Sequence, residues 1–393
     1  MSAALIDRNP DLKRLLDEGY EVEVRKGLLL LHSVPYVNSR REVARGTLVC
    51  KLPLAGDVTA QPRDHVAYFI GEYPCDSAGQ ELSAIRNSSN PQILDNVVEV
   101  NHTFSAKPKE PDKNHHEKMT RYIEFISPHA NVLEPGVSAR TYKPVDSSQD
   151  EDLVFCYQDT NSCRAGTAAL AQRLGQQRLA IVGLGGTGAY VLDFVAKTPV
   201  REIHLYDEDG FLSHNAFRTP GAPSLEQLRA KPTKVHYLHA IYSRMHKGII
   251  PHDAKATEAN IVELLGLDFV FLCVDNGPSR KLIAEALCTG NIPFTDTGMG
   301  LDLVPGDKGL SGICRVTSFN PSKKDHLARL PMGAGQDDAY TANIQVAELN
   351  ALCAAHAVIR WKKSQGFYVD LTRENHSVFT IDTNHLLNDE FQG

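Results

Sequence analysis

Residues 178–188 read Arg-Leu-Ala-Ile-Val-Gly-Leu-Gly-Gly-Thr-Gly, and this stretch decides the fold. The apolar run 179–182 is typical of a buried parallel strand. Gly183, Gly185 and Gly188 then give the spacing G-x-G-x-x-G, which permits a tight turn and lets backbone amides approach a phosphate. Apolar residues recur afterwards at helical spacing. The pattern therefore predicts a strand, a glycine turn and a helix whose N-terminus faces an anion.

A second predicted strand, residues 202–206, ends at Asp207. A carboxylate that binds ribose hydroxyls is expected about 20 residues beyond such a glycine turn. By themselves these features indicate a nucleotide, and NAD is the commonest one. The alternative is a glycine turn that only serves packing.

The residues after Asp207 favour a polyphosphate over NAD. An NAD site needs one acid at the strand end, whereas here Asp209, Asn215 and Arg218 follow closely. Arginine offers a charged fork to phosphate oxygens, and asparagine adds neutral donors. Lys231 and Lys234 supply two further cations.

A third predicted strand, 269–274, ends at Asp275. A carboxylate at the carboxyl end of a parallel strand faces the ligand crevice, where it can hold Mg²⁺ together with substrate phosphates. Capping of the next helix is the alternative role, and one residue can do both. Arg164 precedes the glycine turn, beside a helix predicted over 167–174. The alternative interpretation is a surface arginine at the start of a helix, with no role in binding.

Length, composition and net charge limit the class of protein to which the chain can belong. The chain has 393 residues, 42% of them hydrophobic, which suits two to three domains with sizeable cores. A net charge of −7 argues against a protein devoted to nucleic acid. No apolar run is long enough to span a membrane, and the eight cysteines form no Cys-x-x-Cys pair, so we expect a reducing, cytoplasmic location.

Residues 1–145 predict a separate α+β domain, mostly strands, followed by a polar linker over 144–153 and a nucleotide-binding domain over 155–393. Four histidines of the first domain have spacings that fit no zinc pattern, and we interpret them as solvated loop histidines: His102, His115, His116 and His129.

Five motifs follow one another in the order Gly-Leu-Gly-Gly-Thr-Gly, Leu205-Tyr206-Asp207-Glu208-Asp209, Asn215-x-x-Arg218, a lysine near 234 and Asp275-Asn276-x-x-x-Arg280. Together they resemble the adenylating domain of the ThiF/MoeB and ubiquitin-activating (E1-like) superfamily. The likeness covers roughly residues 155–365. Residues 1–145 resemble a domain that precedes ThiF-type domains in bacterial chains of ubiquitin-like conjugation operons. The resemblance implies an α/β fold: a Rossmann-like adenylation domain with a mostly parallel sheet, preceded by a smaller α+β domain.

Carried across by position, the resemblance implies ATP and Mg²⁺ as cofactors. Four glycines would form the phosphate-facing turn: Gly183, Gly185, Gly186 and Gly188. Asp207 would bind ribose. The triphosphate would be lined by Asp209, Asn215, Arg218 and Lys234, with Lys231 as the other candidate lysine. Asp275 would hold Mg²⁺, and Arg164 would reach ATP, often across a dimer.

The implied reaction is adenylation of the C-terminal carboxylate of a ubiquitin-like protein, with release of pyrophosphate. The implied partners are that modifier, a ubiquitin-conjugating-type enzyme and a second copy of the chain, with no nucleic acid or membrane. Three alternatives stay open: adenylation of a sulfur carrier or another small substrate, an NAD-dependent oxidoreductase, and a non-catalytic scaffold that binds nucleotide.

Two departures from the family pattern matter. Thr219 stands where a glutamine is usual, and residues 319–343 contain no cysteine where a thioester cysteine is expected. The enzyme can stop at the adenylate, form an oxyester on a hydroxyl, or use a cysteine after a movement. The hydroxyl candidates are Ser318, Ser322 and Thr341; the thiol candidates are Cys314, which we expect inside a strand over 312–318, and Cys353.

Overall fold

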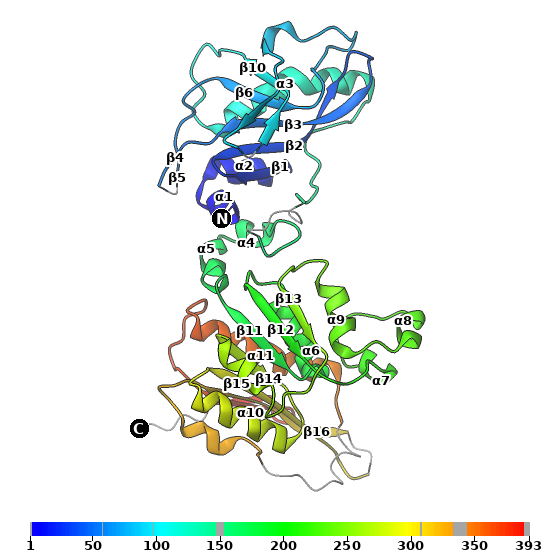
Figure 1. Ribbon diagram of the computed structural model, residues 1–393, viewed down its shortest axis with the longest axis vertical. Coiled ribbons are helices and arrows are strands. Elements are labelled where there is room, and N and C mark those ends of the chain that lie inside the picture. Colours follow the sequence, from blue (N-terminus) through cyan, green and yellow to red (C-terminus); the bar gives the residue numbers. More distant parts are fainter. Residues whose placement is uncertain are drawn as a thin grey trace. The chain divides into compact units, whose positions relative to one another are not determined.

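The computed structural model describes residues 2–56, 58–96, 98–146, 153–306, 309–332 and 344–388. The chain divides into two compact units, Met1–Gln149 with Tyr157–Ala169 and Asp150–Cys156 with Leu170–Gly393 (Figure 1). None of the described helices combines the length and the apolar character needed to cross a lipid bilayer.

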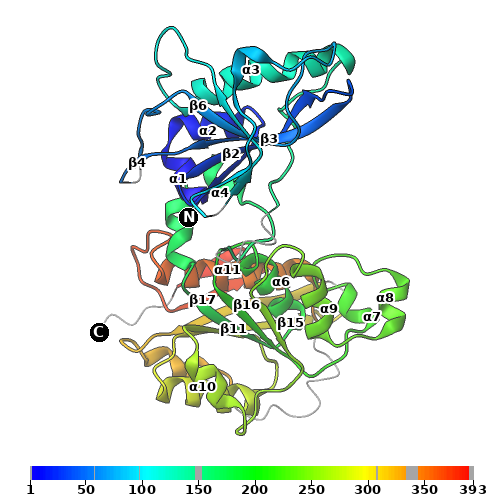
Figure 2. The same ribbon diagram turned by 45° about the horizontal axis from the view of Figure 1, so that its top comes forward.

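The first unit is built on a six-stranded antiparallel sheet in the order β1-β2-β3-β6-β10-β7. Helices α2 and α3 pack on one face, and the small β8–β9 ribbon packs on the other (Figure 2). The strands are β1 Glu21–Arg25, β2 Leu28–Val37, β3 Val43–Lys51, β4 Leu54–Ala55, β5 Val58–Thr59, β6 Val66–Ile70, β7 Arg86–Ser88, β8 Gln92–Leu94, β9 Val98–Val100 and β10 His102–Ser105; the α-helices are α1 Ser2–Arg8, α2 Pro10–Asp17, α3 His115–Leu133 and α4 Thr160–Arg164.

The interpretation of the four histidines as loop residues is wrong. Asn114 caps α3 by accepting the Glu117 N–H at 2.9 Å, so the helix begins at His115 and continues past His129. His115 is fully buried, and His116 contacts the carboxylate of Glu18, the residue that follows α2. His102 lies on strand β10. The polar composition of this stretch hid a helix whose buried face includes histidine.

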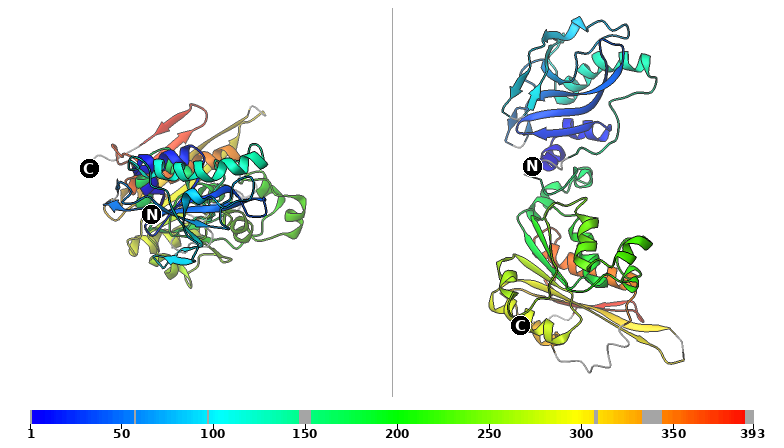
Figure 3. Two further views of the ribbon diagram at one scale, coloured as in Figure 1. Left: turned by 90° about the horizontal axis from the view of Figure 1, so that it is seen from above. Right: turned by 45° about the vertical axis from the view of Figure 1, so that its right-hand side comes forward.

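The second unit contains an eight-stranded sheet in the order β13-β12-β11-β14-β15-β16-β17-β18. The first five strands run parallel and the last four are antiparallel, with β15 shared between the two parts. The strands are β11 Arg178–Val182, β12 Glu202–Tyr206, β13 Ile249–His252, β14 Phe269–Leu272, β15 Phe294–Leu303, β16 Leu310–Phe319, β17 His376–Thr380 and β18 His385–Leu387. The β15–β16 hairpin extends past the shorter parallel strands (Figure 3).

Helices cover both faces of this sheet. Helices α6 and α11 lie side by side on one face together with α9, and α10 covers the other face (Figures 1 and 2). The helices are α5 Ala168–Ala171, α6 Gly186–Val195, α7 Ser213–Ala216, α8 Leu225–Ala230, α9 Lys234–Tyr242, α10 Gly277–Thr289 and α11 Ala347–Ser364. The predicted fold class is confirmed: a Rossmann-like α/β unit preceded by a smaller, antiparallel α+β unit.

The region of the helix predicted over 167–174 contains the short helix α5 and a 3₁₀ segment, and another short helix precedes them. Asp159 caps a separate short helix, α4, by accepting the Ser162 N–H at 3.0 Å. A turn at Gly166, where φ is +67°, then precedes α5 and a short 3₁₀ segment. The prediction that Cys314 lies inside a strand is confirmed, because β16 contains it.

Candidate functional site

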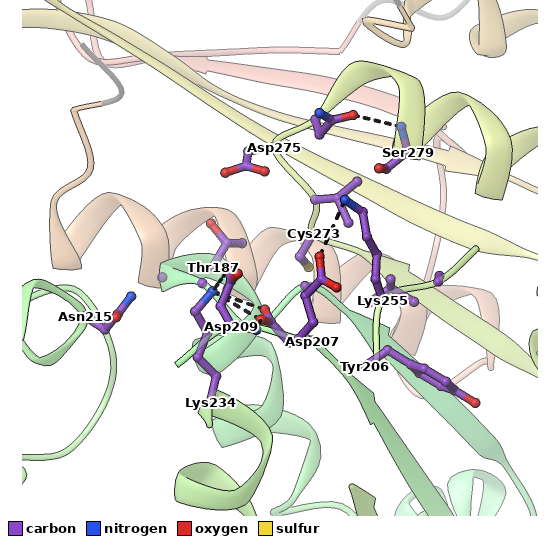
Figure 4. Close-up of a pocket in the computed structure, with 18 of the residues that line it drawn as sticks. Thr187, Tyr206, Asp207, Asp209, Asn215, Lys234, Lys255, Cys273, Asp275 and Ser279 are labelled. Carbon is purple, nitrogen blue, oxygen red and sulfur yellow. Dashed lines mark hydrogen bonds and ion pairs between the residues drawn. The ribbon is translucent and has the colours of Figure 1, made fainter. Parts of the chain in front are cut away.

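The carboxyl ends of β11, β12 and β14 meet at one edge of the parallel sheet. The chain leaves β11 for β12 on one side, whereas β14 pairs with β11 on the other. Such a reversal of strand order opens a crevice beyond the strand ends. A pocket of about 520 Å³ lies there, and Figure 4 shows side chains that line it.

Most of the predicted site residues line this pocket. They are Gly183, Gly185, Gly186, Asp207, Asp209, Asn215, Arg218, Lys234 and Asp275. They come from four separate segments of the second unit, so the fold brings together residues that are far apart in the chain.

Two glycines of the turn, Gly183 and Gly188, lie in contacts that leave no room for a side chain. Gly183 has a φ of +89°, and a Cβ there would lie 2.6 Å from the carbonyl oxygen of Cys273. A Cβ on Gly188 would lie 1.8 Å from the carbonyl oxygen of Gly183, so Gly188 packs the helix onto the strand. At Gly185 the same position is open space, on the pocket side. The turn therefore exposes its backbone where a phosphate can approach.

Asp207 is part of a network that links the glycine turn to α9. Its carboxylate accepts the Leu184 N–H at 2.7 Å and the Asp209 N–H at 2.9 Å. Lys234 Nζ lies 3.2 Å from Asp207 and 2.6 Å from Asp209. The strand end, the turn and the lysine are thus held in a fixed relation before any ligand binds.

Two donors at the pocket have no acceptor among the described residues. Asn215 is 1% exposed; its Oδ1 accepts the Leu212 N–H at 2.8 Å, but its Nδ2 has no partner. The Nε of Arg218 also has no partner. Burial lowers the pKa of the Arg218 guanidinium, and the charge of Asp275 partly opposes that shift. Unpaired buried donors cost roughly 1–3 kcal/mol each, so they call for a ligand with acceptor oxygens.

The role of helix cap belongs to Asn276 and not to Asp275. The Asn276 side chain accepts the Ser279 N–H at 3.0 Å, at the start of α10. Asp275 is exposed at the pocket, and none of the described side chains gives its carboxylate a hydrogen bond or ion pair. Its oxygens are therefore available to a ligand.

Two predicted residues do not line the pocket, and a third belongs to the other unit. Gly188 lies within α6, and Lys231 is the left-handed C-cap of α8, with φ of +47°. Arg164 belongs to the first unit, where its Nε lies 3.7 Å from Asp17.

Other residues at the pocket escaped the sequence analysis. Lys255, labelled in Figure 4, lines the pocket, and its Nζ lies 3.6 Å from Oε1 of Glu208. Lys255 follows β13, a four-residue strand that contains Pro251 and so carried a weak strand signal. Thr187, Cys273, Ser279 and Gln345 also line the pocket. Knowing that β13 is parallel would have pointed to the segment after it.

The candidate acyl acceptors differ in exposure. Cys314 is 3% exposed and Cys353 is fully buried, each in contact with carbonyl oxygens. Ser318 is buried, and its hydroxyl lies 3.0 Å from that of Thr295. Ser322 is exposed. Thr341 lies outside the described residues.

The comparisons with known proteins divide the chain in two. The model of the ThiF family matches residues 161–360, and that of a domain of unknown function (DUF6791) matches residues 10–160. No curated protein matches the chain.

Solved structures resemble part of the chain. E. coli MccB with ATP has 15% identity and a TM-score of 0.45 over 56% of this chain and 65% of MccB. The Microcin C7 biosynthetic enzyme MccB in complex with N-formylated MccA has 16% identity and a TM-score of 0.45, over 57% of this chain and 68% of that enzyme. PaaA has 18% identity and a TM-score of 0.43, over 56% of this chain and 75% of PaaA. The chain thus spans about two thirds to three quarters of these proteins.

Proposed function

The chain belongs to the ThiF family, and from that membership and the geometry of its pocket we propose that it is an ATP- and Mg²⁺-dependent adenylating enzyme. Its substrate is the C-terminal carboxylate of a ubiquitin-like protein, which it activates for conjugation. The NAD-dependent alternative gains no support from a pocket with this many charged side chains.

The observation that carries the proposal is the pair of unfilled donors at the pocket. Asn215 Nδ2 and Arg218 Nε are the buried donors without partners beside the glycine turn, counted over the described residues. A chain of phosphates bound along the turn would supply acceptors to both. A ligand with a single acceptor would leave one of them unsatisfied.

The charge of the pocket favours a divalent cation. Its lining carries four carboxylates (Asp207, Glu208, Asp209 and Asp275) and three cationic side chains (Arg218, Lys234 and Lys255). A net negative lining repels a polyphosphate unless a cation offsets it. Mg²⁺ prefers one or two carboxylates plus substrate phosphates, and Asp275 is the lining carboxylate that no described residue pairs with. When bound, Mg²⁺ neutralises phosphate charge.

The reaction needs positioned charges and no general base. An oxygen of the substrate carboxylate, already ionised at neutral pH, attacks the α-phosphorus of ATP, and pyrophosphate leaves. Arg218 donates to the α-phosphate oxygens as negative charge builds there, and the backbone of the glycine turn holds the phosphates. This suits a pocket of Arg, Lys, Asn and Asp side chains.

We further propose that the domain of residues 1–145 recruits the modifier or its conjugating enzyme, and that the enzyme is a homodimer. The resemblance is the support for the dimer, because it gives the arginine at the position of Arg164 a contact with ATP across a pair of subunits.

Pyrophosphate exchange into ATP tests the proposal. The enzyme is incubated with ATP, Mg²⁺, labelled pyrophosphate and a candidate ubiquitin-like protein from the same gene neighbourhood. Exchange should require the intact C-terminus of the modifier and should fail when that carboxylate is amidated. No exchange with any candidate, together with tight binding of NAD, would overturn the proposal.

The same reaction separates the fates of the acyl group. Formation of adenylate alone leaves the enzyme mass unchanged, whereas an oxyester adds the modifier in a bond that hydroxylamine cleaves. Ser322 is the exposed candidate within the described residues, so Ser322→Ala should abolish such an adduct if one forms. An adduct that persists in Ser322→Ala and is lost in Cys314→Ser would assign it to the thiol.

A further inference from the structure

Asp296 is a fully buried carboxylate held by two arginines. It lies on β15, where it pairs in register with Leu272 of β14. Its Oδ1 accepts from Arg280 Nε at 2.8 Å, and its Oδ2 accepts from Arg315 Nη2 at 2.5 Å. Both arginine side chains are largely buried, with 6% and 11% exposed.

Stability alone is a weak reason to keep such a group. Desolvation of buried ions offsets most of their attraction, and apolar replacements are often equally stable. Here one carboxylate faces two guanidinium groups, which leaves a positive charge in excess. What the network does hold is geometry, since a guanidinium presents its donors in a rigid fork.

Arg280 uses that fork to fix the segment that carries Asp275. One Nη donates to the carbonyl of Val274, and the other donates to the carbonyl of Pro331 at 3.3 Å. On the other side of Asp275, Asn276 caps α10. The Asp275 backbone is therefore held on both sides, by Arg280 before it and by the helix cap after it.

Arg315 anchors Asp296 from the opposite direction. It lies on β16, and its Nη1 donates to Thr317 Oγ1 at 2.7 Å. Gly298 makes room for it, because a Cβ at that position would lie 2.7 Å from Arg315 Nη2. Asp296 thus has one orientation, and it transmits that orientation to Arg280.

We propose that Asp296 is a positioning residue for Asp275. It orients Arg280, Arg280 holds the Val274 carbonyl, and the Asp275 carboxylate is thereby presented to the pocket. The inference rests on the proposed function, in which Asp275 holds the divalent cation. Groups that orient a metal ligand typically change metal affinity by about 10–100-fold when they are removed.

Binding of Mn²⁺ tests this without relying on turnover. The full-length enzyme is titrated with Mn²⁺ in the presence of α,β-methylene-ATP, and free Mn²⁺ is followed by electron paramagnetic resonance. Asp296→Asn keeps the shape but removes the charge that holds two arginines, and should weaken Mn²⁺ binding at least about tenfold. The affinity for the nucleotide without metal should stay within about twofold, because Asp296 does not line the pocket.

A matched control comes from the same unit. Arg360 and Asp370 form another ion pair, with 2.9 Å between Nη1 and Oδ2 and with 12% and 16% of the side chains exposed. Asp370→Asn should leave Mn²⁺ binding unchanged even where it lowers the melting temperature. The double variant Asp275→Asn/Asp296→Asn should bind Mn²⁺ no more weakly than Asp275→Asn alone, since Asp296 acts through Asp275.

A second variant guards against loss of the fold. Arg280→Lys keeps a cation beside Asp296, but its donors lie on one nitrogen. They cannot span the separate positions of Asp296 and of the carbonyls of Val274 and Pro331, so this variant should weaken Mn²⁺ binding in the same way. Wild-type affinity for Mn²⁺ in folded Asp296→Asn or Arg280→Lys would overturn the inference and leave the proposed function standing. Absence of nucleotide-dependent Mn²⁺ binding in the wild type would instead overturn the metal assignment, and the role of Asp296 with it.

Discussion

Arg218 shows at the scale of one residue how the pocket is prepared for its ligand. Its guanidinium is half-buried and keeps one donor unfilled, a state that costs free energy until an acceptor arrives. Arg218→Ala should therefore lower the rate of pyrophosphate exchange by about 10²–10³, as removal of one charge-stabilising donor does elsewhere. The measurement is kcat for exchange at saturating ATP.

Arg229 provides the control for that prediction. It lies on α8, close to Arg218 in the chain, but is exposed and outside the pocket. Arg229→Ala should keep nearly full activity. Equal rates for Arg218→Ala and the wild type would remove Arg218 from the chemistry.

His246 makes the second unit sensitive to acid. It is fully buried, its Nε2 donates to the Val200 carbonyl at 2.9 Å, and its Nδ1 accepts the Gly248 N–H at 3.1 Å. Burial lowers the pKa of His246 to about 4. A second proton would place a donor against the Gly248 N–H, so the fold requires the neutral ring.

The sign of the pH dependence follows from that lowered pKa. The unfolded chain binds the proton near pH 6.5, so the stabilisation by neutral His246 is complete above that pH and is lost as the pH falls towards about 4. Between pH 7.5 and 5 the loss should be about 2 kcal/mol. Glu374 adds little in this window: its pKa is lowered to about 2 in the fold, and the stabilisation that this gives is lost mainly below pH 5, where the unfolded chain binds the proton.

Urea unfolding of the wild type and of His246→Asn at the two pH values measures this contribution. The free energy of unfolding of the variant should depend less on pH by about that amount. Other buried histidines act equally in both proteins and cancel in the difference. Parallel pH profiles for the two proteins would contradict the assignment.

At the scale of elements, local sequence patterns predicted those strands and turns that depend on neighbouring residues. Strand β12 was predicted with its observed bounds, Glu202–Tyr206, because apolar residues stand between clear breaks. The glycine turn and the carboxylates after β12 and β14 followed from spacing alone. These are contacts between chain neighbours or between the ends of adjacent parallel strands, which periodicity encodes.

The site residues that the sequence analysis missed depend on contacts between elements that are distant in the chain. Arg315 is an ordinary polar residue of the strand predicted over 312–318, and only the pairing of β15 with β16 joins it to Asp296. Lys255 follows β13, in which Pro251 weakens the strand signal. Asn350 sits on α11, in a helix that reads as core, although its amide is buried against the glycine turn.

Asn350 joins α11 to both sides of the pocket. Its Oδ1 accepts from Thr187 Oγ1 at 2.9 Å in the first turn of α6, and its Nδ2 donates to the Arg218 carbonyl at 3.5 Å. Asn350→Ala should lower kcat for pyrophosphate exchange by up to about 10²-fold, because small displacements of reacting groups are costly. Thr187→Val removes one of the two contacts and should have a smaller effect. A lower melting temperature with unchanged kcat in Asn350→Ala would restrict Asn350 to a structural role.

At the scale of the whole molecule, the pocket and the single tryptophan lie in the same unit. Trp361 is fully buried against Phe271, with 5.9 Å between ring centroids, so its fluorescence reports the unfolding of the second unit. The residues that line the pocket all belong to that unit as well. Binding of a nucleotide should therefore stabilise the second unit selectively.

Linkage gives the size of that effect. A ligand at 100 times its Kd that binds only the folded protein adds about 2.7 kcal/mol to the free energy of unfolding. Urea unfolding with and without ATP and Mg²⁺, followed by Trp361 fluorescence, should show this shift. Hydrogen exchange of the first unit's sheet, measured in the same samples by mass spectrometry, should not change. Protection of both units would mean that they unfold together or that the first unit contributes to binding. A tryptophan transition that millimolar ATP does not move would mean that the pocket does not hold this nucleotide.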